Sequence, residues 1–171
     1  MNFTFELASA DHVPEIMDLM HFAKDTVVKK EWFVDDDEPY VRSLLAGKGF
    51  IILARPENSS RLAGFFFVKY VGDAPDSLAR FSDLSAEKLP FCAHMDSAAV
   101  YPDFRGYHLQ AQMTAEAEKQ LRNTPYRYLF ATIHPDNLFS LNNMRSMGYE
   151  VIKQVKIYGN LDRYVIFKEL C

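Results

Sequence analysis

The chain has 171 residues, of which 49% are apolar and 25% are charged, as expected for a globular protein with one core. The net charge of −4 disfavours non-specific nucleic-acid binding, and no apolar run approaches the roughly 20 residues that span a membrane. The N-terminus lacks a basic start followed by an apolar stretch, so we expect no signal peptide and a cytoplasmic location. We expect residues 1–171 to form a single domain.

The first part of the chain predicts a strand, two helices and a hairpin. Alternation over residues 3–8 indicates the strand, and apolar residues at helical spacing then continue to about residue 30. A second helix is expected over residues 38–47, where glycines stop it. Two apolar runs, 50–56 and 61–71, are joined by a polar turn and predict the hairpin.

The rest of the chain predicts four strands and two helices after an aperiodic segment at residues 72–90, which we expect to be a loop with a short helix. The expected strands cover 91–100, 126–133, 149–159 and 161–170, and the expected helices cover 106–123 and 137–147. Strand–helix–strand units favour parallel crossovers, whereas the hairpins favour antiparallel pairs. The fold class is therefore α/β (α+β), with a mixed, mostly antiparallel sheet and helices on both faces.

The stretch AVYPDFRGYHLQAQM, residues 99–113, joins the end of a strand to a helix through a proline turn and Arg105-Gly106. A helix start presents unpaired N–H groups and the positive end of the helix dipole, so it binds anions. Successive N–H groups at positions 105–110 are able to wrap a pyrophosphate without particular side chains. A plain strand–turn–helix junction with a solvated Arg105 is the alternative.

Two local patterns stand in this second half of the chain. The first is Val100-x-Pro102 followed by Arg105 and a helix start, and the second comprises Asn137, Ser140, Met144 and Gly148-Tyr149. Both patterns, and the order of the elements, resemble the GCN5-related N-acetyltransferase (GNAT) family, which transfers acetyl from acetyl-CoA to an amine. The resemblance is specific over about residues 94–149.

The resemblance implies the GNAT fold and acetyl-CoA as a cosubstrate, with no metal. It also implies a set of residues that bind the cofactor: Ala98, Ala99, Val100, Arg105, Gly106, Tyr107, His108, Leu109, Gln110, Asn137 and Ser140. His108 and Gln110 depart from the small residues of the family motif. A residue inside a helix at ordinary φ does not need to be glycine, so we expect the N–H groups still to converge.

Transfer to an amine needs a proton acceptor and an oxyanion donor. His94 and Asp96 share one face of a strand, because side chains alternate. His94 stands where histone-acetylating relatives keep a glutamate base, and Asp96 is a candidate for orienting the amine or a water relay. A satisfied structural histidine is the alternative. The family implies an oxyanion donor from the strand backbone near Ala99 or Val100.

The family's tyrosine acid, which protonates the leaving thiolate, is replaced here by Met144. Tyr101 or Tyr158 is a possible substitute. Cys92 lies in an apolar run and is expected to be a core residue, which argues against a covalent acyl-enzyme.

Residues 29–40, KKEWFVDDDEPY, place an acidic run beside Trp32 and Phe33. Such a run either attracts a cationic amine or forms the first turn of a helix, and we favour the helix start. Further on, Asp136 or Asn137 offers an N-cap, and we favour Asp136. His134 has no partner at ligand spacing, so we expect no metal site there.

The predicted function is acetyl-CoA-dependent N-acetylation of a primary amine on a small molecule or peptide, by direct transfer in a ternary complex. A non-catalytic acyl-CoA sensor with the same fold is the alternative that Met144 favours, and an interaction protein that keeps only the scaffold is a third. The closing strands offer a possible homodimer contact. The sequence specifies neither the acceptor nor the length of the acyl group.

Overall fold

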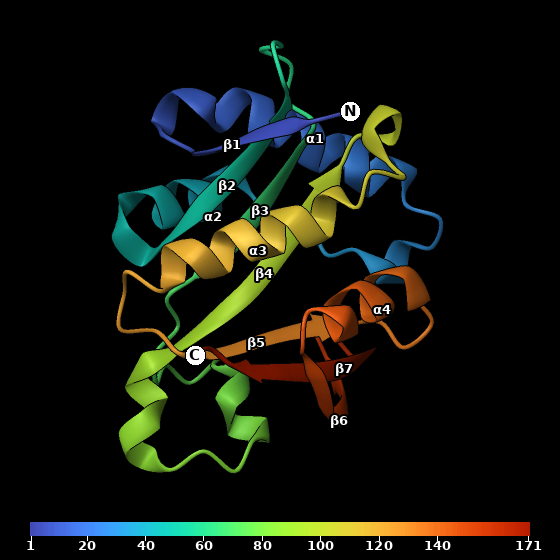
Figure 1. The fold of residues 1–171 in the computed structure, drawn as a ribbon. Coiled ribbons are helices and arrows are strands. Elements are labelled where there is room, and N and C mark those ends of the chain that lie inside the picture. The colour runs from blue at the N-terminus through green and yellow to red at the C-terminus, as the bar shows by residue number, and fades with distance from the viewer.

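The computed structural model describes all 171 residues and contains one seven-stranded sheet flanked by helices (Figure 1). The strands are β1 (Phe3–Leu7), β2 (Gly49–Pro56), β3 (Gly64–Lys69), β4 (Cys92–Val100), β5 (Tyr128–Ile133), β6 (Glu150–Ile157) and β7 (Leu161–Glu169). The helices are α1 (Val13–Thr26), α2 (Glu38–Ser43), α3 (Leu109–Leu121) and α4 (Leu138–Ser146). The sheet order is β1-β2-β3-β4-β5-β7-β6, and only β4 and β5 pair in parallel. The mixed, mostly antiparallel sheet is confirmed.

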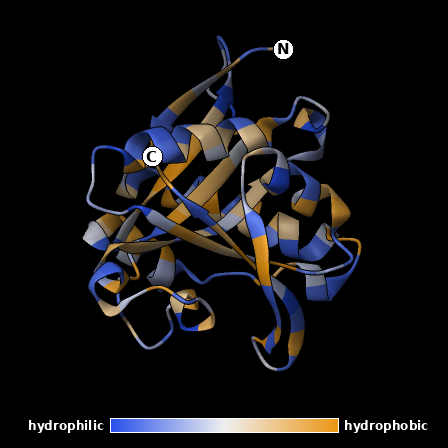
Figure 2. Ribbon diagram, turned by 60° about the horizontal axis from the view of Figure 1, so that its bottom comes forward, coloured by the Kyte–Doolittle hydropathy of each residue, from blue (hydrophilic) through white to orange (hydrophobic).

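The sheet carries helices on both faces. Helices α1 and α2 pack on one face against β2 and β3, whereas α3 and α4 cover the other face. Apolar residues concentrate on the central strands, and hydrophilic residues dominate the outer turns (Figure 2). No helix combines the length and the apolar content needed to cross a bilayer. The two layers of helices therefore bury the sheet from both sides, as the sequence predicts.

Several boundaries and one pairing differ from expectation. Helix α1 ends at Thr26 rather than near residue 30. At this end the Thr26 Oγ1 donates to the Phe22 carbonyl, and the backbone becomes extended at Val27. The aperiodic segment contains two short 3₁₀ turns, Leu78–Phe81 and Ala86–Phe91. Strands β1 and β2 pair antiparallel although helices connect them, so that unit is not the parallel crossover that a strand–helix–strand order predicts.

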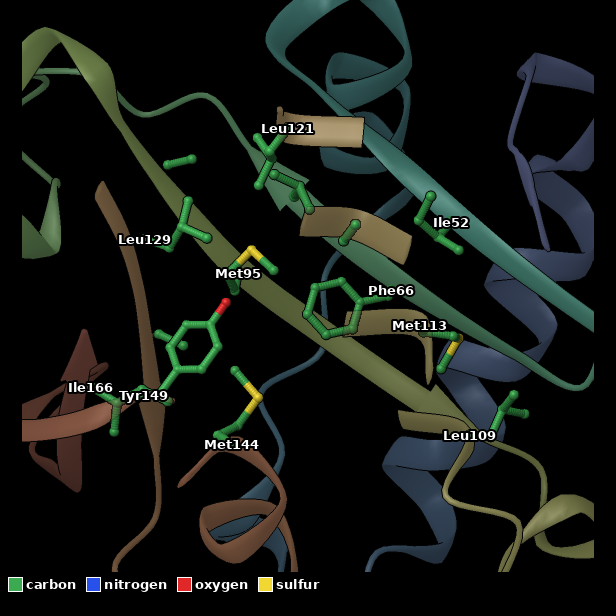
Figure 3. Close-up of a cluster of buried hydrophobic side chains, with 14 of the residues drawn as sticks. Ile52, Phe66, Met95, Leu109, Met113, Leu121, Leu129, Met144, Tyr149 and Ile166 are labelled. Carbon is green, nitrogen blue, oxygen red and sulfur yellow. The ribbon is translucent and has the colours of Figure 1, made fainter. Parts of the chain in front are cut away.

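The buried stripe of α3 is the one predicted by its spacing. Leu109, Met113, Ala117 and Leu121 are all buried against β2, β3 and β4. Three of these side chains lie beside Ile52, Phe66 and Met95 in the core (Figure 3). Burying a side chain of leucine size contributes about 1.5–3 kcal/mol, so this stripe fixes α3 and thereby the turn that precedes it.

A buried ion pair adds a second anchor for α3, and the sequence pattern gave no sign of it. Lys168 Nζ on β7 donates to both carboxylate oxygens of Glu118, at 3.0 and 2.9 Å, and to the Met147 carbonyl at 2.7 Å. The Tyr149 hydroxyl donates to the same carboxylate at 2.9 Å. Because the Glu118 carboxylate and the Lys168 ammonium are both hydrogen-bonded, this network holds α3 in position relative to β7.

Candidate active site

The parallel pair β4–β5 opens into a cleft. Pairing covers only Cys92–His94 against Tyr128–Phe130, and beyond it the strands diverge. From Met95 to Val100, β4 therefore has no strand on its β5 side. Two adjoining cavities fill this opening. The turn cavity, about 420 Å³, is bounded by residues 104–106 and 108–110, α1 and the start of α4. The carboxylate cavity, about 200 Å³, contains Asp36 and Asp96.

The turn between β4 and α3 supplies a row of unpaired backbone donors. The Arg105 N–H donates to the Pro102 carbonyl at 3.2 Å, so this amide is already used. The N–H groups of residues 106–111 have no acceptor within the protein. Gly106 has φ +85°, a conformation that a residue with a side chain rarely adopts. The turn therefore presents consecutive amides and a helix N-terminus beside the turn cavity.

His108 corrects one expectation about this turn. It is the N-cap of α3 with φ +55°, rather than a residue inside the helix at ordinary φ. Histidine tolerates this left-handed conformation better than most residues, although glycine would adopt it without strain. His108 lines the turn cavity, which retains a volume of about 420 Å³ beside it. Gln110 is helical as expected and lines both cavities.

Most of the other predicted cofactor residues line a cavity, and Tyr107 does not. Ala98 lines both cavities, and Ala99, Val100, Arg105, Gly106 and Leu109 line the turn cavity. The ring of Tyr107 packs edge-on against Phe3 at 5.9 Å, so only its N–H belongs to the row of free donors.

The start of α4 forms the opposite wall of the cleft. Asn137 caps this helix, because its side-chain oxygen accepts from the Ser140 N–H at 3.3 Å. The expectation that Asp136 is the cap was wrong: its N–H donates to His134 Nδ1 at 3.1 Å instead. Asn137 and Ser140 line both cavities, so the N-termini of α3 and α4 meet at one opening.

A β-bulge directs two polar residues of β4 into the carboxylate cavity. Phe66 pairs with Ala98 and Val68 with Met95, so Asp96 and Ser97 stand opposite a single residue of β3. Such bulges bend a strand and re-aim its side chains. The Tyr40 hydroxyl from α2 donates to Asp96, and Ser97 Oγ donates to the Asp36 carboxylate at 2.6 Å.

The two carboxyl groups in this cavity hold their protons more tightly than usual. Burial, followed by the neighbouring Asp96 charge, raises the pKa of Asp36 from 3.8 to about 6. Burial also raises the pKa of Asp96, against the opposing effect of the Tyr40 hydrogen bond. Asp96 lies open to the cavity but is surrounded by protein on its other sides, so it is reachable and still poorly solvated. A carboxylate with a pKa near neutrality is suited to accepting a proton.

The acidic run of the α1–α2 connection divides by role. Asp37 caps α2 by accepting from the Tyr40 N–H at 2.9 Å, which confirms the expected helix start. Asp35 pairs with Lys24 at 3.1 Å. Only Asp36 enters the cavity, beneath Trp32 and Phe33, which line both cavities.

Two predicted catalytic residues lie outside both cavities. His94 is only 9% exposed, and its Nε2 accepts from the Leu78 N–H at 2.9 Å. Burial lowers its pKa to about 4. Tyr101 packs on the Phe22 ring at 5.3 Å. The hypotheses that His94 is the base and Tyr101 the acid are therefore set aside, because neither reaches the cleft.

Cys92 is a core residue. Its side chain is fully buried, and burial raises the pKa of the thiol to about 11. A neutral, enclosed thiol is not a nucleophile for an acyl group.

Tyr158 and Arg163 complete the carboxylate cavity. The Tyr158 hydroxyl lies 3.2 Å from Thr132 Oγ1. The residue is 47% exposed, yet partial desolvation by the surrounding protein raises the pKa of this tyrosine. Arg163 was not among the predicted residues, yet it is 3% exposed and lines the cavity. The alternation of β7 predicts that Arg163 is buried, because it falls on the same face as the buried Val165.

Comparison with protein-family models gave no match, and comparison with curated proteins gave none either. Solved structures match along the whole chain. One is Arabidopsis thaliana NAA60 in complex with acetyl-CoA, with a TM-score of 0.77, 14% identity and 99% of each chain covered. The chain has the GNAT acetyltransferase fold.

Two further structures with the GNAT fold support the same assignment. A GNAT superfamily phosphinothricin acetyltransferase from Sinorhizobium meliloti, in complex with acetyl-CoA, gives a TM-score of 0.75 at 17% identity, covering 99% of this chain and 89% of the other. An N-acetyltransferase from Staphylococcus aureus gives 0.75 at 14% identity, with both chains fully covered. At these identities the similarity establishes the GNAT fold, and the activity has to be argued from the site.

Proposed function

We propose that the chain is an N-acetyltransferase that transfers an acetyl group from acetyl-CoA to a primary amine within a ternary complex. The observation that carries this proposal is the row of N–H groups at 106–111, which have no protein acceptor and stand at the mouth of the β4–β5 opening. A CoA pyrophosphate is the anion that such a row and a helix N-terminus would bind. Arg105 beside the turn adds a positive charge.

The cleft leads from this turn to the two carboxyl groups. Ala98, Asn137 and Ser140 line both cavities, so a chain of pantetheine length bound at the turn would pass them and bring its thioester towards Asp96. The exposed backbone of β4 near Ala99 or Val100 is the proposed donor to the oxyanion. The walls are small at Ala98 and Ala131, which suits a narrow acyl-carrying chain.

The Asp36–Asp96 pair is the proposed proton acceptor. An ammonium group entering the carboxylate cavity gives a proton to the pair, and the neutral amine attacks the thioester carbonyl. The C–S bond then breaks, and the CoA sulfur leaves with a proton donated by Tyr158, which lines the same cavity. The nitrogen gives up its second proton as the amide forms, and this proton restores the tyrosine hydroxyl. The products are the N-acetyl amide and CoA. Met144, which is buried at the cavity floor, has no proton to give.

A second candidate is an acyl-CoA sensor that binds the cofactor without turnover. The replacement of the usual tyrosine by Met144 favours it. The carboxyl pair and Tyr158 favour the enzyme, because a sensor needs neither a base nor an acid.

Two measurements test the proposal. Titration calorimetry with acetyl-CoA should show binding in the micromolar range, and release of free CoA thiol should follow addition of an amine from a panel. Binding without release on any amine would support the sensor instead. No binding at all would remove both candidates.

A further inference from the structure

Arg163 is a buried cation without a carboxylate partner. It is 3% exposed and makes no salt bridge, although β7 lies beside several acidic residues. Its guanidinium donates to two backbone carbonyls, those of Asp162 and Glu31. A guanidinium has five N–H donors, so three remain for other partners. Burial lowers the pKa of Arg163, because the charged guanidinium is taken out of water.

Arg163 lines a cavity of mixed charge, and its guanidinium carbon lies 5.8 Å from the centre of the Tyr158 ring. Arg163 and Tyr158 line the carboxylate cavity together with Asp36 and Asp96. Asp96 is on β4 and Arg163 is on β7, with β5 between them in the sheet (Figure 1). Because β4 and β5 diverge beyond His94, a space opens between Asp96 and β5, and a small molecule in this space can form a hydrogen bond at each end.

We propose that the acceptor is an α-amino acid, whose carboxylate is bound by Arg163 while its amine faces the Asp36–Asp96 pair. This inference rests on the proposed acetyltransferase function and names its substrate class. Arginine binds carboxylates through two parallel hydrogen bonds, so it fixes orientation as well as charge. The cavity volume of about 200 Å³ is matched to a molecule of that size.

The remaining walls indicate which amino acids fit. Trp32, Phe33 and Val34 line the cavity from the α1–α2 connection. They offer mainly apolar contact to a side chain, with one buried N–H donor at Trp32 Nε1 and no charge. An apolar amino acid such as L-leucine, L-methionine or L-phenylalanine is therefore the expected acceptor.

Arg163 has a structural role that the test must separate. Its bond to the Glu31 carbonyl ties β7 to the segment that carries Trp32 and Asp36. A variant that only loosened this tie would impair every acceptor equally. Loss of a carboxylate site would impair only acceptors that carry a carboxylate.

The experiment compares each apolar amino acid with its own amide in the CoA-release assay. The amide has the same side chain and a less basic amine, so near neutral pH a larger fraction of it is unprotonated and able to attack, and without carboxylate recognition the amide would be used at least as well. We expect the parent protein to favour L-leucine over L-leucinamide by at least about 30-fold in kcat/KM. Arg163→Met should lower the value for the amino acid about 30- to 100-fold and change the value for the amide less than threefold.

Three controls make the result decisive. Arg163→Lys keeps the charge and should retain part of the preference, and Arg122→Met removes an arginine at the far end of α3 and should retain all of it. Circular dichroism melting shows whether each variant is folded. Equal use of acid and amide by the parent, or an equal loss of both in Arg163→Met, would overturn the inference and leave the acetyltransferase function standing.

Failure of the proposed function has a different signature. In that case no amine releases CoA, with or without a carboxylate. Calorimetric titration of L-leucine and L-leucinamide into the CoA-loaded protein then decides the inference alone. Selective binding of the amino acid, lost in Arg163→Met, supports it, and no selectivity contradicts it.

Discussion

The two cavities of the cleft are built in different ways. The turn cavity takes its polar groups from the main chain of one continuous segment, residues 106–111, and from the start of α4. The carboxylate cavity takes them from side chains on the α1–α2 connection, β4, the β6–β7 turn and β7. A backbone site depends on local conformation, whereas a side-chain site depends on how distant elements pack. Substitutions should therefore affect the two cavities through different measurable quantities.

The largest expected effect separates turnover from cofactor affinity. Asp96→Asn and Asp36→Asn each remove one member of the proposed proton acceptor, so kcat should fall about 100-fold, within the range for a lost general base. The dissociation constant of acetyl-CoA, measured by calorimetry, should change less than twofold. In the parent, kcat should rise with pH through about 6 as the Asp36 carboxyl ionises. Full activity in both variants would exclude the carboxyl pair from the chemistry.

The converse change acts on the turn cavity. Arg105→Glu places a carboxylate beside the proposed pyrophosphate position. The affinity for acetyl-CoA should fall about 30-fold, because a charge-assisted hydrogen bond is lost and a repulsion is added. Arg105→Gln should cost less, because it adds no negative charge. Calorimetric titration measures both variants, and an unchanged affinity in Arg105→Glu would remove the turn from the binding site.

A smaller effect concerns stability in the carboxylate cavity. The pKa of Asp36 is raised in the folded protein, so folding favours the protonated carboxyl, and this contribution is lost as pH rises from about 4 to about 6. At pH 7.5, Asp36→Asn should therefore raise the free energy of unfolding by about 1–2 kcal/mol, less than the full shift implies because the carboxyl is open to the cavity. The gain should vanish near pH 4.

Urea unfolding at the two pH values measures this difference. Asp35→Asn is the matched control, because its carboxylate pairs with Lys24 outside the cavity. It should show no gain at either pH. A gain in the control equal to that of Asp36→Asn would indicate a general effect of net charge rather than burial at Asp36.

The smallest expected effect lies in the turn. His108→Gly relieves a left-handed residue with φ +55°, so the free energy of unfolding should rise by about 0.5–1 kcal/mol. Acetyl-CoA affinity should stay within twofold, because the N–H groups remain. Gln110→Gly, at a helical position of α3, should instead lose about 1 kcal/mol. A loss of stability in both would mean that the imidazole itself stabilises the turn.

The local features of the molecule were largely predictable from the sequence. The stripe from Leu109 to Leu121, the hairpins and the strand–turn–helix at Arg105 follow from periodicity and turn residues, which act over a few positions. The left-handed conformation of His108 was not predictable, because its side chain gives no strong signal for positive φ. It arises where the chain must leave the Pro102 turn and enter α3.

The carboxylate cavity was predictable only in part. Asp96 was a candidate, but the bulge that aims it into the cleft depends on the pairing of β3 with β4. His94 was assigned a role that its contact with Leu78 removes, because nothing local shows that a later 3₁₀ turn folds onto it. Asp36 and Arg163 reach one cavity from the α1–α2 connection and from β7, and tertiary packing rather than sequence spacing brings them there.

The most direct test of the account is an NMR titration of ¹⁵N-labelled protein with CoA. The central claim is that the N–H groups of residues 106–111 bind the pyrophosphate. It predicts that these amides show the largest chemical-shift changes and become protected from hydrogen exchange. Changes of that size confined to other segments, with residues 106–111 unmoved and still exchanging freely, would contradict it.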